Sequence, residues 1–107
     1  MNLPKVIADL VKAQDSFDSV AYANCFSETA VVFDDGKIYN GRKEIERWIA
    51  SANEQFKAVM KPVSFEKGKT GGVLKAEISG DFPGSPIVLS YHLEIVDEQI
   101  ESLKITG

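Results

Sequence analysis

Residues 26–48 read FSETAVVFDDGKIYNGRKEIERW and combine two strand patterns, a tight turn and the start of a helix. The β-branched and aromatic run 29–33 is typical of a strand, and a second short run follows at 37–39. Asp35 and Gly36 lie between the two runs, and Asp-Gly at such a place predicts a hairpin. A long amphipathic helix is then predicted by apolar side chains three or four positions apart: Ile45, Trp48, Ile49, Ala52 and Phe56.

Two further helices are predicted before this hairpin. The apolar stripe of the first helix breaks at residues 14–16, where Asp15 and Ser16 can each cap a second helix. Residues 17–26 are apolar almost all round, so this second helix is expected to be more buried than the first. The first helix is predicted by one stripe at helical spacing: Leu3, Ile7, Leu10 and Val11.

From residue 59 the apolar period changes to two, which predicts a run of antiparallel strands. Pro62 indicates that the first of them is an edge strand or carries a bulge, and turns are predicted at Gly68 and at Gly71-Gly72. Helices followed by a strand meander predict an α+β fold, with three helices covering one face of a curved, mainly antiparallel sheet. If the sheet curls strongly, sheet and helices form a cone whose interior can hold a small molecule.

Composition narrows the possible partners. A chain of 107 residues fits one domain, 1–107. With 12 basic and 16 acidic residues the net charge is −4, which repels phosphate backbones and anionic lipids, so neither nucleic acid nor a membrane is an expected partner. One cysteine and one histidine do not make a zinc site, and with no Gly-rich phosphate loop no metal or cofactor is expected. The N-terminus has no signal-peptide core, so we expect a cytoplasmic protein.

Three motifs carry a family resemblance: F-S-E-T-A-V-V-F-D at 26–34, G-x-x-x-I-x-x-W at 41–48, and Tyr-His-Leu at 91–93. In this order they resemble the nuclear transport factor 2-like superfamily, and within it the SnoaL-like and ketosteroid-isomerase-like proteins. The resemblance covers almost the whole chain. It implies a cone-shaped α+β barrel of cystatin-like architecture, and a homodimer. It leaves the activity open, because this fold hosts isomerases, dehydratases, cyclases, hydrolases and non-catalytic binding domains.

The isomerase resemblance assigns roles to particular positions. Its general-base aspartate, at the end of the first strand, matches Asp34. Its two oxyanion donors, a tyrosine and a protonated aspartate, match Leu10 and Tyr91. One donor is therefore missing and the other has changed type, although the phenol of Tyr91 can still donate to a developing enolate oxygen.

Each of these residues also has a structural interpretation. Asp34 begins an Asp-Asp-Gly turn, where aspartate is common, and Tyr91 can be an ordinary core tyrosine. His92 falls on the opposite face of its strand from Tyr91, which favours a surface or dimer contact. Cys25 has no histidine partner for nucleophilic catalysis and is interpreted as a small buried hydrophobe.

Two functions remain open at this point, and whether the chain is an enzyme is undecided. The first is the binding of a small apolar molecule, with isomerase, cyclase or dehydratase action on a carbonyl compound through Asp34 and Tyr91. The second is a non-catalytic dimeric binding module that uses the outer sheet face around Ser90, His92 and Glu94. The aromatic residues on the second and third helices line a pocket in the first interpretation, whereas in a purely structural interpretation they belong to the hydrophobic core. The expected substrate pocket is Phe17, Tyr22, Phe26, Trp48, Phe56 and Leu89.

Overall fold

The computed structural model describes residues 1–107. None of its helices is both long enough and apolar enough to cross a membrane. The helices are α1 (Lys5–Asp15), α2 (Ser19–Asn24) and α3 (Gly41–Phe56). The strands are β1 (Phe26–Asp34), β2 (Lys37–Asn40), β3 (Val59–Lys67), β4 (Gly71–Ser79), β5 (Ile87–Val96) and β6 (Gln99–Thr106).

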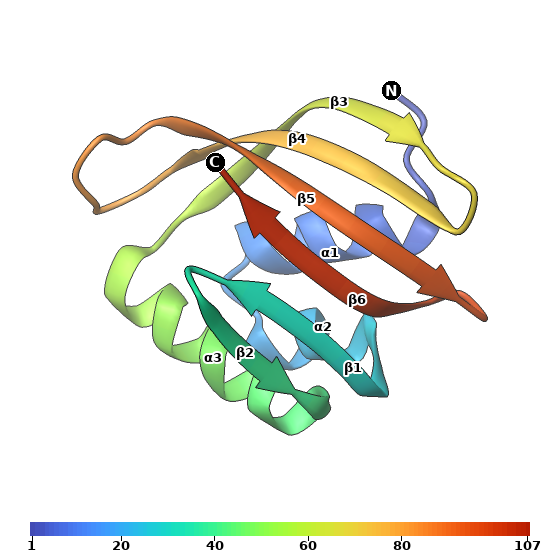
Figure 1. Ribbon diagram of the computed structural model, residues 1–107. Coiled ribbons are helices and arrows are strands. Elements are labelled where there is room, and N and C mark those ends of the chain that lie inside the picture. Colours follow the sequence, from blue (N-terminus) through green and yellow to red (C-terminus); the bar gives the residue numbers. More distant parts are fainter.

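The strands form one six-stranded sheet in the order β2-β1-β6-β5-β4-β3. All neighbours are antiparallel except β1 and β6, which are parallel. The sheet curves over the helices and does not close, since β2 and β3 remain its two edges (Figure 1). The predicted α+β class, with helices on a curved and mainly antiparallel sheet, is confirmed.

The core lies between the helices and the concave face of the sheet. Helix α1 packs against α2 and β3, while α3 packs against α2, β1 and β2. Arg42, in the first turn of α3, donates from Nε (3.0 Å) and Nη2 (2.8 Å) to the carbonyl oxygen of Phe26, which fixes the start of α3 beside the start of β1. The largest fully buried side chains come from helices and strands alike: Tyr22, Phe26, Ile7, Leu10, Ile45, Leu74, Ile100, Leu103 and Val32.

Strand β3 has both of the features that Pro62 predicts. It is an edge strand, and its pairing with β4 shifts register between Pro62 and Ser64. A bulge bends the strand that carries it and increases its twist. The edge position and the irregularity together let the sheet curl around α1.

The second helix differs from the prediction of residues 17–26. It is only Ser19–Asn24, and its N-cap is Asp18, whose side chain accepts from the Ala21 amide at 3.0 Å. Asp15 instead accepts from the Met60 amide at 2.8 Å, and so joins α1 to β3. The helix ends early because the chain enters the sheet there, with the Ile100 amide donating to the Cys25 carbonyl at 2.9 Å.

The turn predicted at Gly71-Gly72 is wrong, because both glycines lie inside β4. Gly71 pairs with Glu94, and a β-carbon at Gly71 would lie 2.0 Å from the carbonyl oxygen of Leu93. These glycines are therefore required by close backbone approach and not by a turn.

A Gly71→Ala substitution should destabilise the fold. The backbone must move to admit the methyl group, and overpacking of this kind costs about 1–3 kcal/mol. Gly68→Ala is the matched control, because the nearest atom to its β-carbon would be 3.7 Å away. Urea denaturation of both variants checks this: equal midpoints would contradict the close approach between β4 and β5.

Candidate active site

An apolar cavity of about 110 Å³ lies between α3 and the concave face of the sheet. Ten of its 13 lining residues are hydrophobic, so its few polar groups define its chemistry. Those groups come from five elements: Gln14 of α1, Tyr22 of α2, Asp34 of β1, Asn53 of α3 and Tyr91 of β5. The cavity is smaller than the roughly 300–1,000 Å³ of a typical drug-sized pocket.

Six of the eight residues expected at the site lie around this cavity: Asp34, Tyr91, Tyr22, Trp48, Phe56 and Leu89. The other two do not line it. Phe17 follows α1 in a left-handed conformation (φ 54°) and is 44% exposed, because the second helix begins beyond it. Phe26 is fully buried as the first residue of β1 and packs on the ring of Tyr22, with centroids 5.7 Å apart.

The register of three strands brings Asp34 and Tyr91 to one side of the sheet. Phe33 of β1 lies opposite Lys104 of β6, which sets Asp34 beside Ile105 as the next pair along. Ile105 in turn pairs with Tyr91 of β5. Neighbouring strands are about 4.8 Å apart, so the two backbones are separated by about 10 Å and their side chains share a face.

Asp34 is half-buried at the cavity and precedes the turn of the β1–β2 hairpin. Loss of water around its carboxyl raises its pKa above the usual aspartate value, and the nearby charge of Asp35 raises it further. A polar interaction with the Trp48 side chain opposes part of this rise. The turn and cavity interpretations of Asp34 are thus compatible, because the residue serves as the end of a strand and as a wall of the cavity.

Two buried phenols accompany this carboxyl. Burial raises the pKa of Tyr91, and the charge of Asp34 adds to the rise. Burial also raises the pKa of Tyr22 well above the usual value. The charges of Tyr91, Cys25 and Asp34 raise it further by smaller amounts. Both hydroxyls therefore keep their protons at neutral pH and can donate hydrogen bonds. Tyr22 thus brings a second phenol to the cavity.

Aromatic packing holds the walls in place. The Trp48 ring stacks on Tyr39 of β2, with centroids 5.3 Å apart, and meets the edge of Tyr22 at 6.1 Å. Phe56, at the other end of α3, meets Phe82 edge-on at 6.2 Å. Such contacts restrict both rings and keep the cavity small.

Sequence reasoning missed two cavity residues, Gln14 and Asn53. Gln14 Nε2 donates to Asn53 Oδ1 at 3.0 Å and to the Ala58 carbonyl at 2.7 Å. Both side chains are buried. A signal was present, because Gln14 continues the stripe of Leu10 and Asn53 that of Ile49 at a spacing of four, and polar residues on an apolar stripe are unusual.

A wider depression of about 700 Å³ adjoins the cavity on the outer side of α3 and the β1–β2 hairpin. The two hollows share Asp34, Trp48, Ala52 and Phe56. Asp34 therefore stands where the small inner cavity meets a larger and more polar outer space.

The sequence matches no protein-family model and no curated protein. Among solved structures, a candidate polyketide cyclase from Sinorhizobium meliloti is 32% identical with a TM-score of 0.93, over 97% of this chain and 95% of that one. The chain belongs to the nuclear transport factor 2-like superfamily. A protein of ketosteroid-isomerase-like fold from Catenulispora acidiphila, in complex with trimethylamine, has a TM-score of 0.88 at 17% identity, over 99% and 87% of the two chains. SalBIII, an epoxide hydrolase/cyclase-like enzyme in pyran ring formation in salinomycin, has a TM-score of 0.75 at 17% identity, over 94% and 86%.

This member of the nuclear transport factor 2-like superfamily has no tyrosine at Leu10, which is fully buried in the core. Tyr22, from the next helix, reaches the cavity instead. His92 is exposed on the outer face of β5, where its Nε2 lies 3.0 Å from Thr106 Oγ1. No group of three His, Cys, Asp or Glu side chains is placed to hold a metal ion.

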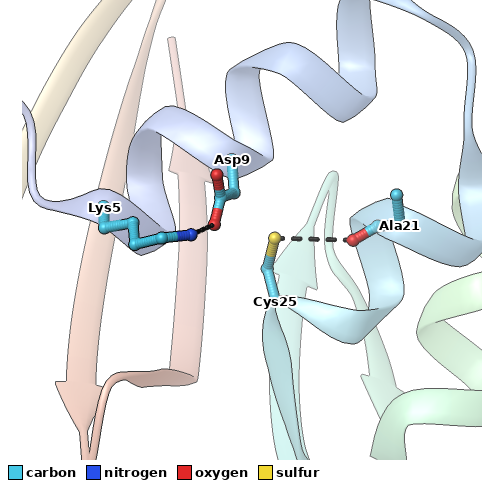
Figure 2. Close-up of polar contacts among 4 residues, drawn as sticks. All are labelled: Lys5, Asp9, Ala21 and Cys25. Atoms are coloured by element: carbon cyan, nitrogen blue, oxygen red, sulfur yellow. Dashed lines mark hydrogen bonds and ion pairs between the residues drawn. The ribbon is translucent and has the colours of Figure 1, made fainter.

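A third hollow, of about 840 Å³, lies between α1 and α2. Figure 2 shows the Lys5–Asp9 ion pair (2.8 Å) on its α1 side and Cys25, whose Sγ donates to the Ala21 carbonyl at 3.5 Å. Burial, followed by the charge of Asp9, raises the pKa of Cys25 to about 11. A thiol so rarely ionised at neutral pH is a poor nucleophile, so Cys25 does not supply an activated nucleophile to this hollow.

We expect the pKa of Asp34, measured by carboxyl-carbon NMR, to lie above the aspartate reference of about 3.9. The signal is assigned by its loss in Asp34→Asn. A pKa at or below the reference would show that the carboxyl is fully solvated or hydrogen-bonded, and would contradict its place at the cavity.

The raised pKa of Asp34 also predicts how the stability of the fold depends on pH. Because the folded state holds the proton more tightly than the unfolded state, ionised Asp34 destabilises the fold at neutral pH. Asp34→Asn should therefore be more stable than the wild type above the folded-state pKa. The difference should shrink as the pH falls through that pKa and vanish below the unfolded-state value. Thermal unfolding of both proteins between about pH 3 and about pH 8, a range that brackets the titration of Asp34, checks the sign of this stability difference.

Proposed function

We propose that this protein is a cofactor-independent enzyme that moves a proton next to the carbonyl group of a small apolar compound, as a cyclase, isomerase or dehydratase. One observation carries the proposal: Asp34, the only carboxylate lining a mostly apolar cavity, has a raised pKa and shares that cavity with two protonated phenols. A base whose pKa lies closer to the working pH is better suited to proton abstraction.

Asp34 would remove a proton from the carbon beside the carbonyl. The electron pair of that C–H bond moves to the carbonyl oxygen, and the hydroxyl of Tyr91 donates a hydrogen bond to the enolate oxygen that forms. Return of the proton from Asp34 to the far carbon of a conjugated C=C bond completes an isomerisation. Attack of the enolate on a second carbonyl carbon closes a ring, while the π pair of that carbonyl moves to its oxygen, which takes the proton from Asp34. Loss of a β-hydroxyl as water, with the proton from Asp34, gives dehydration. A single donor of this kind is worth about 3 kcal/mol in other enzymes.

The structural relatives favour ring closure among these outcomes. The relative at 32% identity is a candidate polyketide cyclase, and SalBIII is named for pyran ring formation. The hollows suit a substrate longer than the cavity, with its reacting end in the 110 Å³ space and the remainder in the adjoining depression.

We also propose that the protein is cytoplasmic. The single thiol of Cys25 is free, which fits a reducing compartment.

Exchange of the α-protons of cyclohexanone in D₂O, followed by proton NMR, tests the chemistry. We expect the wild type to exceed the buffer rate, Asp34→Asn to lose about 10²–10⁴-fold of the enzymic rate, and Tyr91→Phe to lose about 10²-fold or more. The wild-type rate should rise with pH and level off above the pKa of Asp34.

Glu54→Gln is the control, because Glu54 is exposed on α3 and lines neither hollow. An Asp34→Asn rate equal to that of the wild type would remove the base from the mechanism. A wild-type rate equal to the buffer rate would favour the binding-module alternative.

We also propose a homodimer that pairs the outer faces of two sheets. This face carries charges of both signs, Lys75, Lys104, Glu77 and Glu94, on strands that lie side by side. Val88 is 51% exposed beside them. A twofold axis through such a face sets each basic side chain against an acidic one of the second copy, which is the arrangement that a self-complementary interface requires.

Sedimentation equilibrium checks the dimer. Val88→Lys should shift the protein toward monomer, because it places a charge in the apolar part of the interface. Val20→Lys is matched to it, since Val20 is 54% exposed on α2, away from the sheet. A wild type that stays monomeric at high concentration would count against the proposed interface.

A further inference from the structure

Among the buried side-chain nitrogen and oxygen atoms of the protein, only Asn53 Nδ2 has no hydrogen-bond partner. The Asn53 side chain is just 8% exposed and lines the inner cavity. An unpaired buried donor costs about 1–3 kcal/mol, so its presence in a folded protein needs a reason.

The orientation of this amide is fixed by its neighbours. The Ala58 carbonyl can only accept, so it holds the amino group of Gln14 toward itself at 2.7 Å. The same amino group donates to Asn53 Oδ1 at 3.0 Å. If the Asn53 amide were flipped, its amino group would face the amino group of Gln14, donor against donor. Oδ1 is therefore the atom that accepts from Gln14. Nδ2 is left as a donor held in one position and without a partner.

Packing alone does not explain Asn53. An apolar residue of similar size at this position would lose one hydrogen bond and remove the unpaired donor, while Gln14 would keep its bond to the Ala58 carbonyl. A preset donor in an apolar cavity has the properties of a ligand-orienting group, since such pockets place a few polar groups among apolar walls.

The position of Asn53 relative to Asp34 defines what it can bind. Asp34 interacts with the side chain of Trp48, and Asn53 follows Trp48 by five positions on α3. Five helical residues rise about 7.5 Å, so the base and the amide address different ends of the cavity. The carbonyl oxygen is only two bonds from the carbon that Asp34 deprotonates, so it stays at the Asp34 end and leaves the amide for a different oxygen.

We propose that Asn53 Nδ2 binds a second acceptor oxygen of the substrate, so that the protein selects compounds with an oxygen across the ring or chain from the reacting carbonyl. The inference rests on the proposed function for the role of Asp34, but Asn53 itself is a specificity residue and takes no part in proton transfer. Gln14 is its positioning residue. The substrate class is a cyclic or short-chain dicarbonyl or oxygen-substituted ketone.

Binding of cyclohexane-1,4-dione and cyclohexanone, measured by titration calorimetry, tests this without turnover. The two ketones differ by one acceptor oxygen. We expect the wild type to bind the dione about fivefold more tightly, the worth of one hydrogen bond to a donor that is otherwise unpaired. Asn53→Leu should remove this preference, and Glu54→Gln should keep it. Solvation differences between the ketones cancel in the comparison of variants.

A second measurement does not depend on the folding of Asn53→Leu. In the wild type, the side-chain amide resonances of Asn53 should shift with the dione and much less with cyclohexanone, while those of the exposed Asn24 should not move. The same ratio of ketone affinities in the wild type and in Asn53→Leu, or a dione that leaves the Asn53 amide unmoved, would overturn the proposal.

These outcomes separate the two ideas. A ratio of ketone affinities that Asn53→Leu leaves unchanged, together with Asp34-dependent proton exchange, would remove only the role of Asn53. A dione preference that depends on Asn53, without any exchange, would leave the acceptor site in place and remove the proposed proton chemistry. Absence of binding by either ketone overturns the acceptor site directly.

Discussion

The parallel pairing of β1 with β6 is the constraint on which the site depends. It is the one parallel contact in the sheet, and it joins a strand from the first third of the chain to the last strand. Without it the β1–β2 hairpin would have no neighbour within the sheet, and the end of β1 would not lie beside Ile105. The antiparallel pairing of β6 with β5 then carries the alignment across to Tyr91. Strand pairing thus brings two residues 57 positions apart (34 and 91) to one face of the sheet and one cavity.

The cavity is a compromise between packing and chemistry. Trp48, Tyr22 and Phe56 fill most of the space under the curved sheet and leave only about 110 Å³. Two of the polar groups that remain are unfavourable for folding: a carboxyl that burial keeps from its usual solvation, and an amide nitrogen without a partner. Sites that destabilise the fold in this way are where function is expected, because local consistency is given up there for chemistry.

Much of this could be predicted from the sequence, because the decisive signals are local. Alternation in β5 places Tyr91 inward and His92 outward, and the end of the 29–33 run places Asp34 at the edge of the core. The misses concern contacts between distant segments. Nothing near Phe26 indicates that it leaves the helix for a strand, because its partner Ile100 is far along the chain. Gly71 resembles a turn residue until its approach to Leu93 is known. The Gln14–Asn53 bond spans 39 positions, so periodicity could mark each residue as unusual but could not pair them.

The two ends of the cavity differ in how they are held, and this difference bears on specificity. Asp34 adjoins a turn and the open outer depression, where water and a long substrate can reach it. Asn53 Oδ1 accepts from Gln14 of α1, and the same Gln14 amino group donates to the Ala58 carbonyl just before β3, so the orientation of the Asn53 donor is fixed by a network of three segments. A group fixed by neighbouring hydrogen bonds loses little freedom when a ligand binds, which favours tight discrimination at that end. The base, being nearer to solvent, can exchange its proton between reaction cycles. An apolar cavity with a rigid donor at one end and a titratable base at the other therefore separates the selection of a substrate from the chemistry performed on it.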